Sequence, residues 1–400
     1  MAEGPIEVEV GNGITLTEES SPPEELPEPK IKQSAPIQQY TGRPVLLHDR
    51  YAIDPSTSIP EMDGPSAKAY SVKDNVHPNR NLFALVCNSD LPTRIDVMVS
   101  VQEQEIDGLI PLISWGTLNW PLMGKHSMAL IYELPRGGLI IRAIENKELQ
   151  LNELEIQKRI LPPIITGIVS LSELGHVHRS IRPSNIFFMD ESLQILVLGN
   201  CVTSPCGFDQ PIIFETIERS TSSPGGRGQG TFADDIYALG VTLALLLLGK
   251  DHMDMIGEEK LLDLKLQRGS YDAICGNANF PSTVSKLLRG MLDDNVNARW
   301  GKEELNSWVE GSKVPSVKQA AAINAQNPYH FENNVFYNTR SLSLYLSRHL
   351  DTAMEIINDK KLINWLQKDI KNKKQAHSLS TTIEHDVGQK TVDYVIARVA

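Results

Sequence analysis

Short apolar runs separated by turn residues fill residues 45–135. The runs read RPVLL, AKAYSV, NLFALVC, LIPLISWG and SMALIYEL, and stretches such as MDGPS, HPNRN and LPRGG stand between them. Runs of this length that are rich in β-branched and aromatic residues and bounded by Gly, Pro and Asn are typical of strands. The pattern therefore predicts a β-rich region. Residues 93–104 fit a helix, although IDVMVSV also alternates as a strand does.

From residue 152 the hydrophobic spacing becomes helical. Two short strands, NIFFM and QILVL, precede an irregular stretch that ends at Gly230, and the helices VSKLLRGML and KEELNSWV close the region near residue 310. Strands first and helices afterwards indicate an α+β fold of two lobes, at about 43–135 and 136–310. One long helix that continues across Pro162 and Pro163 is predicted by the spacing of Leu154, Ile156, Ile160, Ile164, Ile165, Ile168, Leu171 and Leu174.

The most apolar run, YALGVTLALLLLG, spans residues 237–249. Its thirteen residues are fewer than the roughly 20 that a helix needs to cross a bilayer. Asp234 and Asp235 come directly before the run, as acidic residues do at the first turn of a helix. A helix that is apolar on every side is normally buried. The run therefore predicts a central core helix, with a membrane anchor as the alternative.

A second helical unit is predicted at 333–400, after a linker at 311–332. The chain ends on the apolar run TVDYVIARVA, so we expect that the natural chain continues or that this run docks on another surface. The helical unit is predicted by two apolar faces, one with Leu342, Leu346, Leu350, Met354 and Ile357 and one with Leu362, Leu366 and Ile370.

Charge is distributed unevenly along the chain. The formal net charge is −12 and the pI about 5.4, which argues against nucleic acid or an anionic membrane as a partner. Half of that charge lies in the first forty residues, where eight Glu face only Lys30 and Lys32 and six Pro interrupt regular structure. Residues 1–42 are therefore predicted to be a disordered acidic tail. Protein partners are expected to contact this tail and the C-terminal helices.

The cysteines and the N-terminus indicate a reduced, cytoplasmic compartment. No His cluster gives the four cysteines the spacing of a metal site. The N-terminus MAEGPIEVEV lacks the basic and apolar regions of a secretory signal. The cysteines are Cys87, Cys201, Cys206 and Cys275.

The sequence HRSIRPSN at residues 178–185 resembles the catalytic loop of protein kinases, and further motifs of that family follow in order over residues 45–310. The slot of the metal-binding Asp-Phe-Gly holds Gly199-Asn200-Cys201, and the stretch after it takes the place of the activation segment. The resemblance implies that His178 and Arg179 support the loop and that Asp235 braces its backbone. It also gives structural roles to Gly240, in the motif DIYALG, and to Arg299, and it makes YELPRGG at residues 132–138 the hinge between lobes.

The sequence departs from the kinase family at four features that phosphoryl transfer uses. The base Asp is Ser180, the metal Asp is Gly199, and Val86 or Cys87 stands where the phosphate-binding Lys belongs. No G-x-G-x-x-G cover loop precedes that strand, since MDGPSAKAYSV holds only Gly64. Phosphoryl transfer depends on positioning and on charge stabilisation by these groups, so their combined loss predicts a pseudokinase.

Several retained residues have both a functional and a structural interpretation. Asn185 is a metal ligand in the family, but an Asn in a turn also bonds to backbone, and we favour the second role. Arg179 fits a phosphorylated activation segment at residues 220–223, and Arg182 fits a phosphate or a local partner. ATP and Mg²⁺ are expected only if the cleft is open. Their candidate contacts are Val86, Glu133, Asn185 and Gly199, with Asn185 alone for the metal.

Three functions follow from this pattern. The first is a pseudokinase that acts as a scaffold or regulatory module. The second is an atypical ATP-dependent transferase that uses relocated residues, for which Lys68, Lys73 and Asp190 are candidates. The third is a structural subunit whose cleft is filled by its own apolar side chains, such as Val86 and Leu198.

In each case Arg299 lacks its usual Glu partner, unless Glu218 supplies it, because Ser223-Pro224-Gly225 replaces Ala-Pro-Glu.

Overall fold

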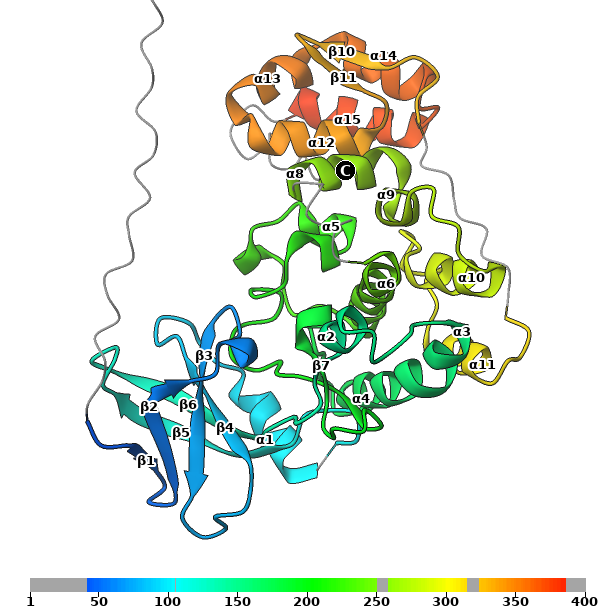
Figure 1. Ribbon diagram of the computed structural model, residues 1–400. Helices are drawn as coiled ribbons and strands as arrows, with labels where there is room; N and C mark the ends of the chain where they lie inside the picture. The colour runs from blue at the N-terminus through cyan, green and yellow to red at the C-terminus, as the bar shows by residue number, and fades with distance from the viewer. Residues whose placement is uncertain (1–41, 105, 250–257, 315–323, 386–400) are drawn as a thin grey trace, which may run out of the picture. The chain divides into compact units, whose positions relative to one another are not determined.

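The computed structural model describes residues 42–104, 106–249, 258–314 and 324–385, and its α+β, two-lobe organisation confirms the predicted fold class (Figure 1). The N-terminal lobe is a six-stranded sheet in the order β1-β2-β3-β4-β6-β5 in which every pair of neighbours is antiparallel. Its strands are β1 (Val45–Leu47), β2 (Tyr51–Ser58), β3 (Ala67–Asp74), β4 (Leu82–Cys87), β5 (Leu112–Trp120) and β6 (Lys125–Glu133).

Strand β4 is buried on both faces, which explains its continuous apolar sequence LFALVC. Because side chains alternate along a strand, Phe83, Leu85 and Cys87 join the main core while Leu82, Ala84 and Val86 join a smaller core on the other face of the sheet. The short helix η1 (Pro60–Met62) and helix α1 (Ile95–Gln104) contribute to the main core. Residues 93–104 thus contain a helix, and the strand alternative is wrong.

Strand β2 was not predicted, because its sequence YAIDPSTS contains Pro55 and a run of hydroxyl residues. Its pairing with β3 shifts register between Ile53 and Ser58. β1 pairs with β2 only at residues 51–53, so Pro55 lies beyond that ladder and beside the register shift, where a proline is tolerated.

The helical lobe is built around α6 (Phe232–Leu248), which is buried along nearly its whole length. Thr231 and Asp234 form a capping box at its start. Within the described residues, no helix combines the length and the apolar character needed to cross a membrane. The remaining elements are β7 (Gly138–Leu139), α2 (Ile140–Glu145), η3 (Pro183–Asn185), β8 (Ile186–Phe188), β9 (Leu196–Leu198), η4 (Ile212–Phe214), α5 (Ile217–Ser220), η5 (Pro224–Gly226), α8 (Glu258–Arg268), α9 (Ser270–Cys275), α10 (Ser282–Met291) and α11 (Lys302–Val309).

The predicted long helix is present as three consecutive pieces, α3 (Glu153–Glu155), the π-helical segment η2 (Ile156–Ile160) and α4 (Leu161–Glu173). Pro162 and Pro163 fall in the first turn of α4, where a missing N–H costs little. The wider π turn lies directly before them, so the helix passes the two prolines without ending.

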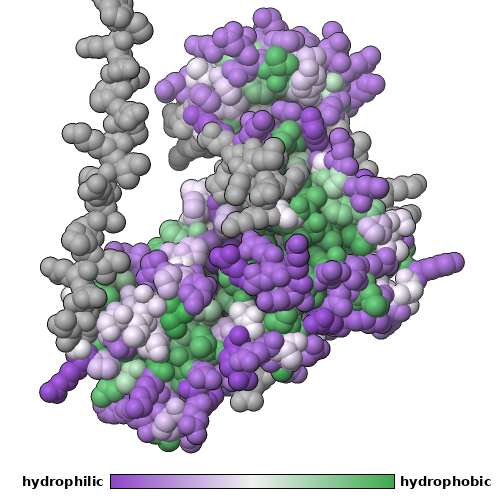
Figure 2. All heavy atoms as spheres, viewed as in Figure 1, coloured by the Kyte–Doolittle hydropathy of each residue, from purple (hydrophilic) through white to green (hydrophobic). Residues whose placement is uncertain are grey.

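The C-terminal unit has a hydrophobic core of its own. It consists of β10 (Tyr329–Phe331), β11 (Asn334–Phe336), α12 (Thr339–Arg348), α13 (Leu350–Asn358), α14 (Lys360–Lys368) and α15 (Lys373–His385). Its buried residues begin at Ala325, so it starts inside the segment predicted as a linker and includes a strand pair that the sequence did not predict. Figure 2 shows a mainly hydrophilic surface on the face of this unit that is drawn. Of the predicted faces, Leu342, Leu346, Leu362, Leu366 and Ile370 are buried.

Other predictions for the two ends of the chain lie outside the described residues. These are the acidic tail, the apolar C-terminal run, and the side chains of Leu350, Met354 and Ile357. The C-terminal unit contacts the helical lobe through α12 and α8. Leu344 packs in a cluster with Leu262 and Leu266, and Asn338 Nδ2 donates to the Leu266 carbonyl at 2.8 Å.

Candidate functional site

A carboxylate from α6 holds the backbone of the loop at 178–185. Asp235 Oδ2 accepts the N–H of His178 and Oδ1 accepts that of Arg179, each at 2.7 Å, and all three residues are buried. The φ of Arg179 is 59°, in the left-handed region that non-glycine residues rarely adopt. Burial raises the pKa of Asp235 to about 6, although both N–H bonds favour its charged form. This is the contact that the resemblance implied for Asp235.

His178 connects the loop to the segment that follows β9. Its Nδ1 accepts the N–H of Ser180 at 3.2 Å, and its Nε2 lies 3.2 Å from the carbonyl of Gly199. Burial lowers the pKa of His178 to about 3, so the ring is neutral. A neutral ring that accepts at Nδ1 must carry its proton at Nε2 and donate it to Gly199. His178 is therefore a structural residue that fixes the distance between two chain segments.

Asn185 and Gly199 meet where the resemblance places a metal site. Asn185 Nδ2 donates to the carbonyls of Ser180 and Asn200, each at 2.8 Å, so its amide bonds to the backbone. A Cβ added to Gly199 would lie 2.2 Å from Asn185 Oδ1 and 2.6 Å from Phe187 Cε2. An aspartate at position 199 therefore does not fit beside Asn185 in this arrangement.

Apolar and polar side chains together nearly close the space between the lobes. The cavity left there has a volume of about 20 Å³, enough for a single water, whereas ligand pockets measure roughly 300–1,000 Å³. Phe83 and Tyr132 line this cavity, and their rings stack on each other with centroids 5.7 Å apart. The lining consists of Met62, Asp63, Gly64, Phe83, Leu85, Ile110, Tyr132, Arg182, Ser184, Asn185, Phe187 and Asn200.

Two residues expected in the cleft lie elsewhere. Val86 points into the core on the opposite face of the sheet, and Leu198 is buried in β9 without lining the cavity. The strand register decides this, because Phe83 and Leu85 occupy the alternate positions that face the helical lobe. Val86 is therefore neither a nucleotide contact nor the residue that fills the cleft. Glu133, the hinge candidate, is exposed at the end of β6.

Two of the three proposed helper residues, Lys68 and Asp190, are engaged in other contacts. Asp63 is the one carboxylate among the lining residues, and it binds Lys68 Nζ at 2.7 Å and the N–H of Ala69 at 2.8 Å. Lys73 is exposed on β3. Asp190 accepts the N–H groups of Gln194 and Ile195 in the turn between β8 and β9. No cluster of three His, Cys, Asp or Glu residues suited to a metal occurs in the described part of the chain. These residues do not fit ATP and Mg²⁺ in the arrangement that the resemblance implies.

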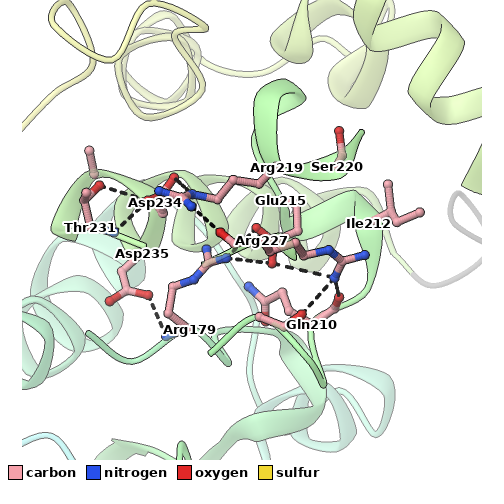
Figure 3. Close-up of polar contacts among 12 residues, drawn as sticks. Arg179, Gln210, Ile212, Glu215, Arg219, Ser220, Arg227, Thr231, Asp234 and Asp235 are labelled. Carbon is pink, nitrogen blue, oxygen red and sulfur yellow. Dashed lines mark hydrogen bonds and ion pairs between the residues drawn. The ribbon is translucent and has the colours of Figure 1, made fainter. Parts of the chain in front are cut away.

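The guanidinium of Arg179 is paired with a carboxylate that sequence reasoning did not find (Figure 3). Its Nη2 lies 2.8 Å and 3.0 Å from the two carboxylate oxygens of Glu215, and both side chains are fully buried. Lys265 Nζ donates to the carbonyls of Ile213 at 2.7 Å and of Glu215 at 3.0 Å, and thereby fixes the same stretch. The Arg179 side chain therefore binds Glu215 and not residues 220–223, which were the predicted partners.

The two other arginines of interest bind neutral groups. Arg182 donates to the hydroxyl groups of Ser180 and Ser184, so it has a local role. Arg299 donates to the carbonyls of Asp293 at 2.9 Å and Ala233 at 3.0 Å. Glu218, the substitute partner considered for Arg299, forms an ion pair with Arg340 of α12 at 3.8 Å.

Gly240 in α6 has a packing role. A Cβ there would lie 2.8 Å from that of Met291, so a glycine allows α6 and α10 to approach closely.

About half of the chain is similar in sequence to protein kinases. No family model matches the chain. A calcium/calmodulin-dependent serine/threonine-protein kinase of Malus domestica is 29% identical over 218 residues, which cover 50% of this chain and 49% of that protein. CBL-interacting serine/threonine-protein kinase 20 of Arabidopsis thaliana is 25% identical over 226 residues, covering 50% and 48%. The SNF-related serine/threonine-protein kinase of Homo sapiens is 26% identical over 204 residues, covering 47% and 24%. The chain is related to the protein kinase superfamily.

The chain spans about half the length of the two plant kinases and about a quarter of the human one. Within the kinase-like part, Asp235 and His178 hold the loop at 178–185, as the resemblance implied. The positions that would carry chemistry in an active kinase hold Ser180 and Gly199.

Proposed function

We propose that the protein is a pseudokinase, a kinase-like protein that works as a scaffold or regulatory interaction module without phosphotransfer. The observation that carries this proposal is the cavity of about 20 Å³ between the lobes, where Phe83 and Tyr132 stack. A nucleotide needs roughly 300 Å³ or more. The bonds of Asn185 to two carbonyls and the absence of space for a carboxylate at position 199 give further support.

Thermal unfolding with 1 mM ATP, with and without Mg²⁺, tests the proposal. We expect no change in melting temperature for the natural chain. A nucleotide at 100 times its dissociation constant would add about 2.7 kcal/mol, a shift of roughly 2–4 °C. A Mg²⁺-dependent shift together with transfer of labelled phosphate to a protein would contradict the proposal and favour the atypical transferase.

Two variants sharpen this test. Phe83→Ala removes one of the two stacked rings, and Leu46→Ala removes an exposed apolar side chain from β1 as the control. If the filled cleft is what excludes nucleotide, Phe83→Ala gains an ATP-dependent shift that Leu46→Ala lacks. If neither variant responds, ATP is excluded by the lost polar groups as well as by volume, and the natural chain remains a non-binder.

The interaction role assigns partner contacts to the acidic residues 1–42 and to the C-terminal helices. It is supported by their net charge and by the separate core of the C-terminal unit. A cytoplasmic location is part of the proposal, since the four cysteines are free. Chains that lack either segment should lose binding of partners that the full chain retains. If both shortened chains keep every partner, this assignment fails.

A further inference from the structure

A larger hollow of about 480 Å³ lies at the start of α6, next to the arginines in Figure 3. It shares no lining residue with the small cavity between the lobes. Its volume is within the range of ligand pockets, roughly 300–1,000 Å³. The lining residues are Thr216, Glu218, Arg219, Ser222, Gly226, Arg227, Thr231, Asp234, Asp294, Val296 and Arg299.

The carboxylates of this pocket already have partners. Asp234 pairs with Arg219 Nε at 2.9 Å and accepts from Thr231 in the capping box. Asp294 accepts the N–H of Ser270 at 3.0 Å and its hydroxyl at 2.5 Å. The third, Glu218, pairs with Arg340 at 3.8 Å. The acidic groups are thus turned toward protein donors.

Of the arginines of the pocket, Arg219 pairs with Asp234 and Arg227 Nη1 lies 3.9 Å from Glu215, whereas Arg299 has no carboxylate partner among the described residues. Arg299 is 7% exposed, and in the described ranges its guanidinium donates to two carbonyls and forms no ion pair. Arg219 donates from Nε to Asp234 and from Nη1 to the carbonyl of Arg227. For neither Arg219 nor Arg299 does Nη2 hydrogen-bond to any residue that the structure describes.

These two arginines flank the first turn of α6, because Arg299 binds the carbonyl of Ala233 and Arg219 binds the side chain of Asp234. The buried guanidinium of Arg299 lies 5.1 Å from the centroid of the Tyr237 ring and has no anion beside it among the described residues, so an anion in the pocket would balance its charge. The N-terminus of a helix adds a partial positive charge at the same place. The wall also carries the hydroxyl groups of Thr216 and Ser222. Guanidinium groups combined with hydroxyl donors are the set that phosphoryl oxygens prefer.

We propose that this pocket binds a phosphoryl group, with Arg219 and Arg299 as the charged contacts and Thr216 and Ser222 as hydroxyl donors. The group belongs to a phosphorylated small molecule or to a phosphorylated side chain of a partner. Binding at this pocket does not depend on the proposed function, because the cavity between the lobes takes no part in it.

The test is a titration of the full chain with sodium phosphate, against sodium chloride at equal ionic strength, followed by thermal unfolding. Phosphate is expected to raise the melting temperature by at least 2 °C and chloride to leave it unchanged. Ser222→Glu places a carboxylate on the wall and leaves the bonds of Arg299 to its carbonyls in place. This variant should weaken phosphate binding at least tenfold, while Arg80→Gln, an exposed turn variant, should bind as the natural chain does.

A short phosphoserine peptide and its unphosphorylated twin distinguish the two possible sources of the phosphoryl group. Binding of the phosphopeptide at least tenfold tighter than inorganic phosphate, with no binding of the twin, supports the proposal with a partner side chain as the source. Equal affinity for phosphopeptide and phosphate supports it with a small molecule as the source. Three results would overturn the proposal. They are a chloride effect equal to that of phosphate, phosphate binding by Ser222→Glu as tight as that of the natural chain, and no response to either phosphate or the phosphopeptide.

Discussion

The loop at 178–185 joins two regions of the molecule that differ in what they retain. On the side of α6, Asp235, Arg179 and Glu215 are buried and bound to one another through short hydrogen bonds. On the side of the sheet, the cavity between the lobes has room for one water, and its charged lining residues, Asp63 and Arg182, are bound to neighbouring protein groups. The loop is therefore held from the side of α6 by buried charged groups whose contacts do not involve the residues around the cavity.

The largest effect is expected from Asp235→Asn, which leaves one buried backbone N–H facing an amide donor. A buried donor without an acceptor costs about 1–3 kcal/mol, and the charge-assisted bonds lost here add to that, so we expect a loss of roughly 3–5 kcal/mol. Urea denaturation measures it. Asp190→Asn is the matched control, because Asp190 also accepts backbone N–H groups but in an exposed turn. Equal losses in the two variants would show that burial of the brace is unimportant.

Glu215→Gln is expected to lower the free energy of unfolding by about 3 kcal/mol, because it leaves Arg179 charged and buried without its partner. The double variant Arg179→Met, Glu215→Leu should lose less than Glu215→Gln, since it removes both buried charges. The exposed ion pair of Lys302 with Glu173, at 3.0 Å, is the control, and Glu173→Gln should have a much smaller effect. If the double variant is less stable than Glu215→Gln, the buried ion pair itself is required for stability.

On the cleft side, Gly199→Asp restores the residue type of an active kinase and should still not restore binding of Mg²⁺-ATP. The new Cβ would lie 2.2 Å from Asn185 Oδ1, and overpacking of this kind costs roughly 1–3 kcal/mol. Gly225→Asp is the control, because no atom lies within 4 Å of its Cβ position. A Gly199→Asp chain that gains Mg²⁺-dependent ATP binding without losing stability would contradict the geometry described here.

A pH-dependent effect concerns Lys265, which supports the Glu215 stretch from α8. Burial lowers its pKa from 10.5 to about 7. A depressed pKa of a basic group means that its contribution to stability is present above pH 10.5 and is lost as the pH falls toward 7. Stability should therefore rise between pH 7 and 10 with a slope of up to about 1.4 kcal/mol per pH unit from this residue. Urea denaturation at several pH values should show a flatter slope for Lys265→Met. An unchanged slope would mean that Lys265 stays charged in the folded protein over this pH range.

Sequence reasoning predicted the fold class and most of the elements. It placed the sheet, the core helix and the loop correctly because their apolar patterns and turn residues are local signals. It missed β2, where Pro55 interrupts the pattern, and β10 and β11, which are three residues long.

The contents of the site depend on contacts between distant parts of the chain. The register of β4 placed Phe83 and Leu85, not Val86, at the cleft. The pairing of Arg179 with Glu215, which lies 36 residues later, has no local signature. The closure of the cavity follows from residues of six separate stretches of the chain and is therefore not readable from any single motif.

The bonds from Asp235 have a consequence for the exchange of amide hydrogens with solvent. The N–H groups of His178 and Arg179 belong to an irregular loop, where protons normally exchange through small local openings. Here their acceptor is a side chain of the central helix, 57 and 56 positions later in the chain. Neither proton can be released unless α6 separates from the loop. In deuterated solvent these two amides should therefore exchange as slowly as those in the middle of α6.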